Sequence, residues 1–311
     1  MNSKKNYILV TAIGSMSASC VLENLYNIDN AAIVGTDIYP AEWQTNLKML
    51  EKFYRVPKYN AKNYVKSILE ICIMNEVKFV FPLTDVEIDI LNRNRYIFEN
   101  NKIIICISDF DTILRCRDKT KIGSNIPMFS QSDLQNADIY PIVAKPKNGR
   151  SSEGKFVLEE SSQLAIIKCL NNYIFQPYFD GQVITVDVIR DKSGNTVSVS
   201  RIELLRTSNG AGTVVEIFED IDLNEIVLNI ANELNILGCV NFEFLYYREV
   251  YYLMDVNPRF SAGVGFSCFA GYNFVKEHLN VFLDKKISEL KKINMDILSK
   301  KTEIVKIGGN R

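Results

Sequence analysis

The most constraining feature of this sequence is a pair of short segments that have the period of β-strands. Residues 240–245 read VNFEFL and residues 251–257 read YYLMDVN. Successive side chains of a strand point to opposite faces, so the second segment places Asp255 and Asn257 on one face, together with Leu253. The sequence therefore predicts a strand with a polar end, and the proline that follows stops it.

A hairpin formed by these two segments would bring three oxygen donors together. If the loop has about three residues near 248–250, Glu243 falls opposite Asp255. Glu243, Asp255 and Asn257 then form one small patch, whose carboxylates repel each other unless a cation binds there. Mg²⁺ held by one or two carboxylates and by nucleotide phosphates is the usual occupant. Arg259, just beyond the strand, is placed to reach the same phosphates. The alternative is a hairpin whose acids face solvent.

The run DVNPR-x-SAG at 255–263, preceded by VNFEF at 240–244, resembles the metal and phosphate end of the ATP-grasp ligases. The similarity is strongest to the branch related to the carbamoyl-phosphate synthase large subunit. It implies an α/β fold of α+β lobes, the ATP-grasp fold, with an N-terminal Rossmann-like pre-ATP-grasp domain. The expected parts are this domain at 1–110, a small lobe with the phosphate loop at 111–180, a large lobe with the metal site at 181–286 and a solvated tail at 287–311.

Composition and charge exclude several other classes. The net charge is −1 with acids and bases interspersed, so no field favours nucleic acid. No apolar run is long enough to cross a membrane and no signal peptide is evident, which predicts a cytoplasmic protein. The seven cysteines are scattered without a CxxC motif and favour neither a zinc site nor a disulfide framework. His278 is the only histidine, which disfavours Ser-His or Cys-His catalysis.

The first hundred residues alternate between predicted strands and helices. We expect strands at 7–12, 31–37, 78–82 and 102–107, and helices at 17–26, 61–75 and 85–99. This order is typical of a doubly wound parallel sheet, whose ligands bind beyond the carboxyl ends of the strands. Asp85 and Glu87 lie there and are candidate substrate contacts. Their alternative role is that of acids in the first turn of a helix. The turn after the first strand lacks the GxGxxG of a dinucleotide site.

A glycine- and serine-rich loop follows a predicted strand that ends at Lys145. Backbone N–H groups of such a loop can bind phosphates while a lysine supplies charge, although most such loops are simple turns. The resemblance assigns Lys119 and Lys145 to the two phosphate-contacting bases, and the mobile phosphate loop to Ser151, Ser152 and Gly154. A helix is expected at 162–170. The loop is expected to close over the phosphates when nucleotide binds.

The segment FQPYFDG at 175–181 resembles the hinge that reads the adenine edge in this family. The resemblance assigns the base contacts to Gln176, Tyr178 and Phe179. Relatives carry a ribose-binding glutamate two residues after the hinge glycine, where this chain has Val183. Asp180 is the candidate that could replace it, and the choice of base stays open.

Two predicted strands at 184–190 and 196–205 lead to a second glycine loop at 209–212. In the family this region faces the acceptor site, which makes Arg201 and Arg206 candidates for binding a substrate carboxylate or an acyl phosphate. The alternative is solvation of an edge strand. A predicted amphipathic helix at 222–237, capped by Asp222, should back the sheet that carries Glu243.

The resemblance implies an ATP-dependent ligase. ATP would phosphorylate a carboxylate, and an amine or similar nucleophile would attack the acyl phosphate with release of ADP and phosphate. The expected cofactors are ATP and Mg²⁺, with Mn²⁺ as a possible substitute, bound by the three oxygen donors above. Lys145 and Arg259 are the expected catalytic cations. The expected partners are a small carboxylate and an amine, with a possible homodimer. The alternatives are a carbamoyl-phosphate-synthase-like phosphorylating enzyme and a nucleotide-binding regulatory protein with a decayed site.

Overall fold

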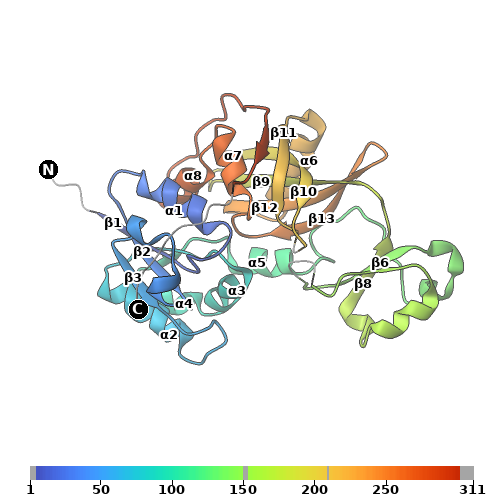
Figure 1. Ribbon diagram of the computed structural model, residues 1–311, viewed down its shortest axis with the longest axis horizontal. Coiled ribbons are helices and arrows are strands. Elements are labelled where there is room, and N and C mark those ends of the chain that lie inside the picture. The colour runs from blue at the N-terminus through green and yellow to red at the C-terminus, as the bar shows by residue number, and fades with distance from the viewer. Residues whose placement is uncertain (1–4, 150–152, 209, 302–311) are drawn as a thin grey trace.

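The computed structural model describes residues 5–149, 153–208 and 210–301 of the chain. Three sheets organise these residues (Figure 1): a parallel sheet in the N-terminal domain, a small antiparallel sheet in a protruding lobe, and a large antiparallel sheet above them. Within the described residues, no helix has the length and apolar character needed to cross a bilayer. The architecture is the mixed α/β arrangement that the sequence predicts.

The N-terminal domain is a five-stranded parallel sheet with strand order β3-β2-β1-β4-β5. Its strands are β1 (Asn6–Val10), β2 (Ala31–Asp37), β3 (Lys52–Arg55), β4 (Phe79–Phe81) and β5 (Ile104–Ile105). Its helices are α1 (Ala18–Tyr26), α2 (Tyr64–Met74), α3 (Asp85–Arg93) and α4 (Arg95–Glu99). The helix expected at 85–99 is interrupted because the Asn94 side chain donates to the Ile90 carbonyl at 2.8 Å, which competes with the helical backbone. The edge strand β3 was not predicted, since it is only half-buried and lacks an apolar alternation.

The small lobe is an antiparallel sheet of order β7-β6-β8, formed by β6 (Ile142–Pro146), β7 (Phe156–Leu158) and β8 (Tyr173–Pro177). Helix α5 (Phe110–Arg117) connects the N-terminal domain to it (Figure 1). The expected α-helix at 162–170 is wrong. The chain forms the short 3₁₀ helices Ser161–Ile166 and Leu170–Asn172 instead. Ile167 is extended between them, which leaves each piece too short to support an α-helix. Two further 3₁₀ turns, at Asp133–Gln135 and Ala137–Ile139, precede β6.

The large lobe is a six-stranded antiparallel sheet with strand order β13-β12-β9-β10-β11-β14. Its strands are β9 (Gln182–Arg190), β10 (Thr196–Arg206), β11 (Gly212–Phe218), β12 (Gly238–Tyr247), β13 (Val250–Asn257) and β14 (Ile297–Ser299). Its helices are α6 (Ile221–Glu233), α7 (Val264–Phe269) and α8 (Phe274–Phe282). The stretch expected to be a solvated tail instead packs on this lobe. Ile287 and Ile293 are buried, and β14 pairs with β11.

Helix α6 begins and ends earlier than its amphipathic pattern predicts. Asp220, not Asp222, is the N-cap, because its carboxylate accepts the Leu223 N–H at 2.8 Å. The helix stops at Glu233 because Asn235 adopts a positive φ of 53°, which no helical residue can hold. The apolar face of α6 packs on the sheet as expected, with Leu223 fully buried in the same core as Phe242.

The β12–β13 hairpin has the predicted register, with Glu243 opposite Asp255. A β-bulge follows this pair: Phe244 pairs with Leu253, so Met254 is the extra residue. The bulge corrects one prediction, because it turns Leu253 into the core while Asp255 stays on the opposite face. The alternation read from the sequence assumed an uninterrupted strand.

A shared core joins the N-terminal domain to the large lobe. Residues of α1 and of the parallel sheet pack in one apolar cluster with residues of α7 and α8. His278 lies within it, where Nδ1 accepts the Cys239 N–H at 2.8 Å and the ring meets Phe81 edge-on. Burial lowers the pKa of His278 to about 3, so the ring is neutral and structural. The N-terminal domain and the large lobe are therefore held together by one continuous apolar core.

The hairpin turn gives a stability prediction. Its two residues, Arg248 and Glu249, have φ values of 49° and 62°, which strain residues other than glycine. Glu249→Gly should raise the free energy of unfolding by about 0.5–1 kcal/mol, while Glu225→Gly in the exposed face of α6 should lower it by about 1 kcal/mol. Urea denaturation of both variants checks this. A destabilised Glu249→Gly variant would show that the turn is not strained.

Candidate active site

Two cavities meet at the β12–β13 hairpin. The first, which we call the lobe cavity, lies between the small and large lobes and has a volume of about 160 Å³. The second, the interdomain cavity, lies between the N-terminal domain and the large lobe and has a volume of about 370 Å³. Arg206, Glu243 and Asp255 line both cavities. A group transferred from a molecule in one cavity to a molecule in the other would pass these three side chains.

Glu243 and Asp255 form the acidic centre of this junction. Burial raises the pKa of Glu243, and the nearby Asp255 carboxylate raises it further, whereas Arg206 opposes the shift. Arg206 Nη2 lies 3.2 Å from Glu243 Oε2, and Lys119 Nζ lies 2.8 Å from Asp255 Oδ2. The two carboxylates thus repel each other and are balanced by side-chain cations.

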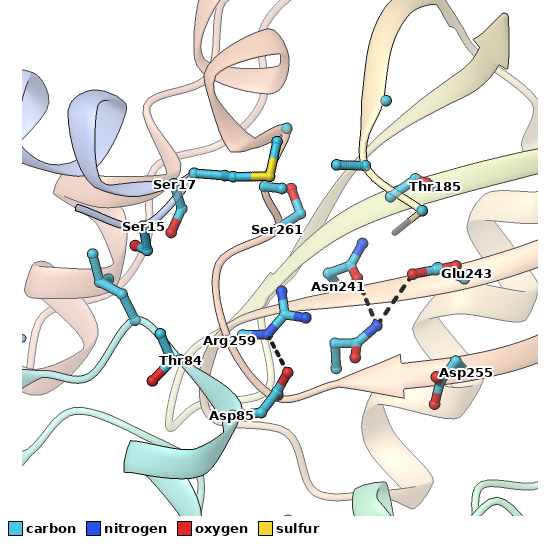
Figure 2. Close-up of a pocket in the computed structure, with 18 of the residues that line it drawn as sticks. Ser15, Ser17, Thr84, Asp85, Thr185, Asn241, Glu243, Asp255, Arg259 and Ser261 are labelled. Carbon is cyan, nitrogen blue, oxygen red and sulfur yellow. Dashed lines mark hydrogen bonds and ion pairs between the residues drawn. The ribbon is translucent and has the colours of Figure 1, made fainter. Parts of the chain in front are cut away.

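Asn257 completes the set of oxygen donors. Its Nδ2 donates to Asn241 Oδ1 at 3.0 Å and to Glu243 Oε1 at 3.4 Å; Figure 2 marks both contacts by dashed lines that end at the labelled Asn241 and Glu243. Because the amide nitrogen takes those contacts, the amide oxygen is left for another partner. Two carboxylates and one amide oxygen suit Mg²⁺, which is usually bound by one or two carboxylates with phosphates filling other positions. The described residues contain no richer cluster of histidine, cysteine or acidic ligands.

Lys119 and Lys145 converge on the same junction from the small lobe and its connection. Lys145 Nζ donates to the Met254 carbonyl at 3.2 Å, and Lys119 Nζ donates to the Gly149 carbonyl at 3.0 Å. Burial lowers the pKa of Lys145 to about 8, Asp255 partly restores it, and Lys119 lowers it further. Both lysines line the lobe cavity, where an anion would relieve their mutual repulsion.

The far end of the lobe cavity is lined by Gln176, Tyr178, Phe179 and Val183. Gln176 is only 3% exposed, and its Nε2 has no hydrogen-bond partner among the described residues. The Phe179 ring stacks on Tyr247 with a centroid separation of 5.0 Å. This end combines apolar walls with one free amide donor, as a flat heteroaromatic ligand requires.

Two predicted nucleotide contacts, Asp180 and Gly154, do not line this cavity. Asp180 is exposed and does not line it, so it does not replace the missing glutamate there. Gly154, at a φ of 70°, packs beside Pro146. The remaining predicted loop contacts, Ser151 and Ser152, lie outside the described residues, as does part of the loop expected to close.

Arg259 is held by the N-terminal domain. Its Nε donates to Asp85 Oδ2 at 3.0 Å, and Asp85 Oδ1 accepts from Arg117 Nη1 at 2.6 Å (Figure 2 shows the first contact). Burial disfavours the Asp85 carboxylate, but Arg259 and Arg117 outweigh it and lower the pKa of Asp85 to about 2. Asp85 therefore acts as an anchor for two arginines. The contact between Arg117 and Asp85 was not predicted. The only sign of it in the sequence is that Arg117 lies in a charged run at 115–119.

Two predicted substrate contacts are used by the protein itself. Glu87 lines neither cavity, because its carboxylate is buried among the hydroxyls of Thr11, Tyr64 and Thr84. Arg201 is 1% exposed, so the solvated edge-strand alternative is also wrong. Its guanidinium is bonded to Asp187 at 2.6 Å, to Glu203 at 3.3 Å, to Ser261 at 3.0 Å and to Ser267 at 3.2 Å.

Arg201 therefore shapes the cavity more than it offers a binding group. Its bonds to Ser261 and Ser267 tie the segment after β13 to the large sheet. Arg206 is different, because it reaches the junction itself, where it contacts Glu243 and the Gly210 carbonyl at 2.6 Å. Of the two predicted arginines, only Arg206 lies where both cavities meet.

Family models match most of the described chain. Residues 170–303 match a model described as ATP-grasp in the biosynthetic pathway with Ter operon. Residues 8–106 match the PylC-like N-terminal domain. The chain thus carries an ATP-grasp domain over residues 170–303, preceded by a PylC-like N-terminal domain over residues 8–106.

Curated relatives support the branch predicted from the sequence. The chain is 30% identical over 128 residues to the carbamoyl phosphate synthase large chain of Caldanaerobacter subterraneus subsp. tengcongensis, a match that covers 38% of this chain and 12% of that protein. It is 28% identical over 174 residues to the same protein of Thermoanaerobacter pseudethanolicus, covering 49% of this chain and 16% of the relative. The chain therefore matches less than a fifth of the length of these relatives.

Solved structures show the same fold. A biotin carboxylase–βγ-ATP complex from Campylobacter jejuni has a TM-score of 0.75 at 17% identity and covers 93% of this chain and 73% of its own. N5-carboxyaminoimidazole synthetase from Staphylococcus aureus complexed with ADP has a TM-score of 0.71 at 14% identity, with coverages of 94% and 81%. At these identities the likeness establishes the fold alone.

The lowered pKa of Lys145 predicts a proton uptake. Without nucleotide the Lys145 amine has a pKa of about 8, so roughly half of it is neutral at that pH. Nucleotide phosphates next to the amine would raise this pKa, so binding of Mg–ADP at pH 8 should take up about half a proton. Calorimetry in buffers of different ionisation enthalpy measures the uptake.

The control for this prediction is Lys145→Arg, because a guanidinium stays charged throughout this pH range. Its binding enthalpy should not depend on the buffer through this group. Equal proton uptake by Lys145→Arg and by the unmodified protein would contradict the assignment of Lys145 to the phosphates.

Proposed function

We propose that this protein is an ATP-dependent ligase that joins a small carboxylate to an amine or similar nucleophile through an acyl phosphate. The observation that carries the proposal is the meeting of two cavities at Arg206, Glu243 and Asp255. Nucleotide would bind in the lobe cavity and the acceptor substrates in the interdomain cavity. The terminal phosphoryl group would then lie at the junction.

The junction has the electrostatics that phosphoryl transfer requires. Charge spreads over the phosphoryl oxygens in the transition state, so catalysis depends on positioned cations more than on a general base. Lys119, Lys145, Arg206 and Arg259 supply four cationic side chains around the acidic pair. Glu243, Asp255 and Asn257 would hold Mg²⁺ or Mn²⁺, which would add charge on the phosphate oxygens.

The reaction would run between the cavities. The substrate carboxylate oxygen would attack the terminal phosphorus while the bond to the leaving ADP oxygen breaks, giving an acyl phosphate. The amine would then attack the acyl carbon and displace phosphate, losing a proton to solvent or phosphate. Walls contributed by both domains would keep water from the acyl phosphate before the amine arrives.

The overall reaction is tested by a screen for ADP release. Purified protein, ATP and Mg²⁺ are incubated with pairs of small acids and amines, and mass spectrometry identifies any joined product. The proposal expects ADP release that requires both partners and a product whose mass equals their sum less one water. ADP release without any joined product would contradict ligation, and nucleotide binding without turnover would favour a regulatory protein.

Asp255 gives a sharper prediction. Asp255→Asn removes one carboxylate from the metal patch and the partner of Lys119, so turnover should fall by about 100-fold or more. Asp222→Asn, an exposed acid in α6, is the matched control and should keep full activity. Circular dichroism confirms that both variants fold. ADP production at the unmodified rate by Asp255→Asn would disprove the metal assignment.

A further inference from the structure

The interdomain cavity has a second polar end, formed by the start of α1. Ser15, Met16 and Ser17 line the cavity there, across from Glu243 and Asp255 (Figure 2). Helix α1 has nine residues, no acid in its first turn and no side chain that caps it. Backbone N–H groups at the start of a helix lack intrahelical acceptors and carry partial positive charge. Because the start of a helix does not by itself define a binding site, the side chains around it determine whether a ligand can bind there.

Ser17 provides an independent sign of a ligand. The residue is only 4% exposed, and its hydroxyl has no hydrogen-bond partner among the described residues. Figure 2 shows this hydroxyl turned into the cavity, next to Ser15. The Ser15 hydroxyl is buried without a partner in the described chain, which costs free energy that a hydrogen-bonding ligand would offset.

The backbone of this turn also has N–H donors without acceptors in the described chain. The N–H groups of Met16 and Ser17 have no acceptor within the described chain. Asp37 contacts the same loop, but its carboxylate is already used: Oδ2 accepts the Gly14 N–H at 2.9 Å and Oδ1 accepts the Tyr39 N–H at 3.0 Å. The free groups at this end are therefore N–H and O–H donors.

Charges elsewhere in the cavity are matched within the protein. Arg259 pairs with Asp85, and Arg206 pairs with Glu243. The start of α1 differs, because its partial positive charge has no acidic side chain in the first turn to balance it. An anionic group of a ligand would satisfy both the charge and the free donors.

We propose that the start of α1 binds an anionic group, a carboxylate or a phosphate, on one of the two substrates. This group is additional to the reacting one, which must lie at the other end of the cavity near Glu243 and Asp255. The inference rests on the proposed function, because it takes the interdomain cavity to hold the acceptor substrates. The anion site narrows the substrate class to dicarboxylates, to phosphorylated acids or to amino acids. In each of these the anionic group that does not react would bind at the start of α1.

The test compares Ser17→Asp, Ser17→Ala and the control Ser19→Ala. Ser19 is an exposed serine of the same helix turn, so its substitution leaves the cavity unchanged. Inorganic phosphate and succinate are titrated separately into each protein, and the backbone N–H signals of Met16 and Ser17 are followed by NMR. The titrations are run with and without saturating Mg–ADP, which covers the phosphate sites of the lobe cavity.

The proposal expects saturable shifts of these two signals in the unmodified protein and in Ser19→Ala. Ser17→Asp places a negative charge, like that of the ligand, at the site and should raise the dissociation constant by about tenfold or more. Ser17→Ala should raise it by a smaller factor. The probe that binds more tightly identifies the anionic group as phosphate or carboxylate. Absence of shifts with both probes, or equal affinities of Ser17→Asp and Ser19→Ala, would overturn the proposal.

Failure of the proposed function would look different. Mg–ADP binding is measured by calorimetry on the same proteins, and α1 does not line the lobe cavity, so Ser17→Asp should bind Mg–ADP like the unmodified protein. If calorimetry detects no binding of Mg–ADP to the unmodified protein, the result contradicts the ligase proposal. The titrations without nucleotide would still report on the anion site.

Discussion

The repulsion between Glu243 and Asp255 is the constraint on which the rest of the site depends. The hairpin register places these carboxylates opposite each other, and their partial burial weakens the screening of their charges by water. Lys119 and Arg206 approach to within 3.2 Å and balance them in the protein itself. We propose that a metal–nucleotide complex binds at this site, because the same cationic side chains would then act on phosphate oxygens.

Much of this could be predicted from the sequence because local periodicity determined it. The alternation in the two segments and the turn expected between them at 248–250 predicted the hairpin, its register and the oxygen donors. Contacts between distant segments were not accessible in the same way. The role of Asp85 as an anchor depends on Arg117 and Arg259, which lie 32 and 174 residues away. Two local features also differ from the sequence prediction: a periodic pattern contains neither the bulge at Met254 nor the N-cap at Asp220, whose carboxylate also accepts a hydrogen bond from the Tyr251 hydroxyl.

The two domains are coupled through charge as well as through their shared core. Asp85 at the start of α3 holds Arg259 of the large lobe, so a residue of the N-terminal domain positions a cation at the junction. Within the large lobe, Arg201 holds the segment after β13 by binding Ser261 and Ser267. Residues that looked like substrate contacts in the sequence are therefore supports. The groups left free for ligands are neutral donors: Gln176 lies in the hinge segment that the sequence singled out, whereas Ser17 lies in no motif.

The central claim is that a metal–nucleotide complex binds where the two cavities meet. A crystal structure with Mn²⁺ and a non-hydrolysable ATP analogue tests it most directly, because the anomalous signal of Mn²⁺ locates the metal without ambiguity. The account predicts a Mn²⁺ peak bonded to Glu243 and Asp255 and to phosphate oxygens, with the base beside Gln176 and Phe179. A nucleotide bound elsewhere, or a metal bonded to the phosphates but not to these two carboxylates, would contradict it.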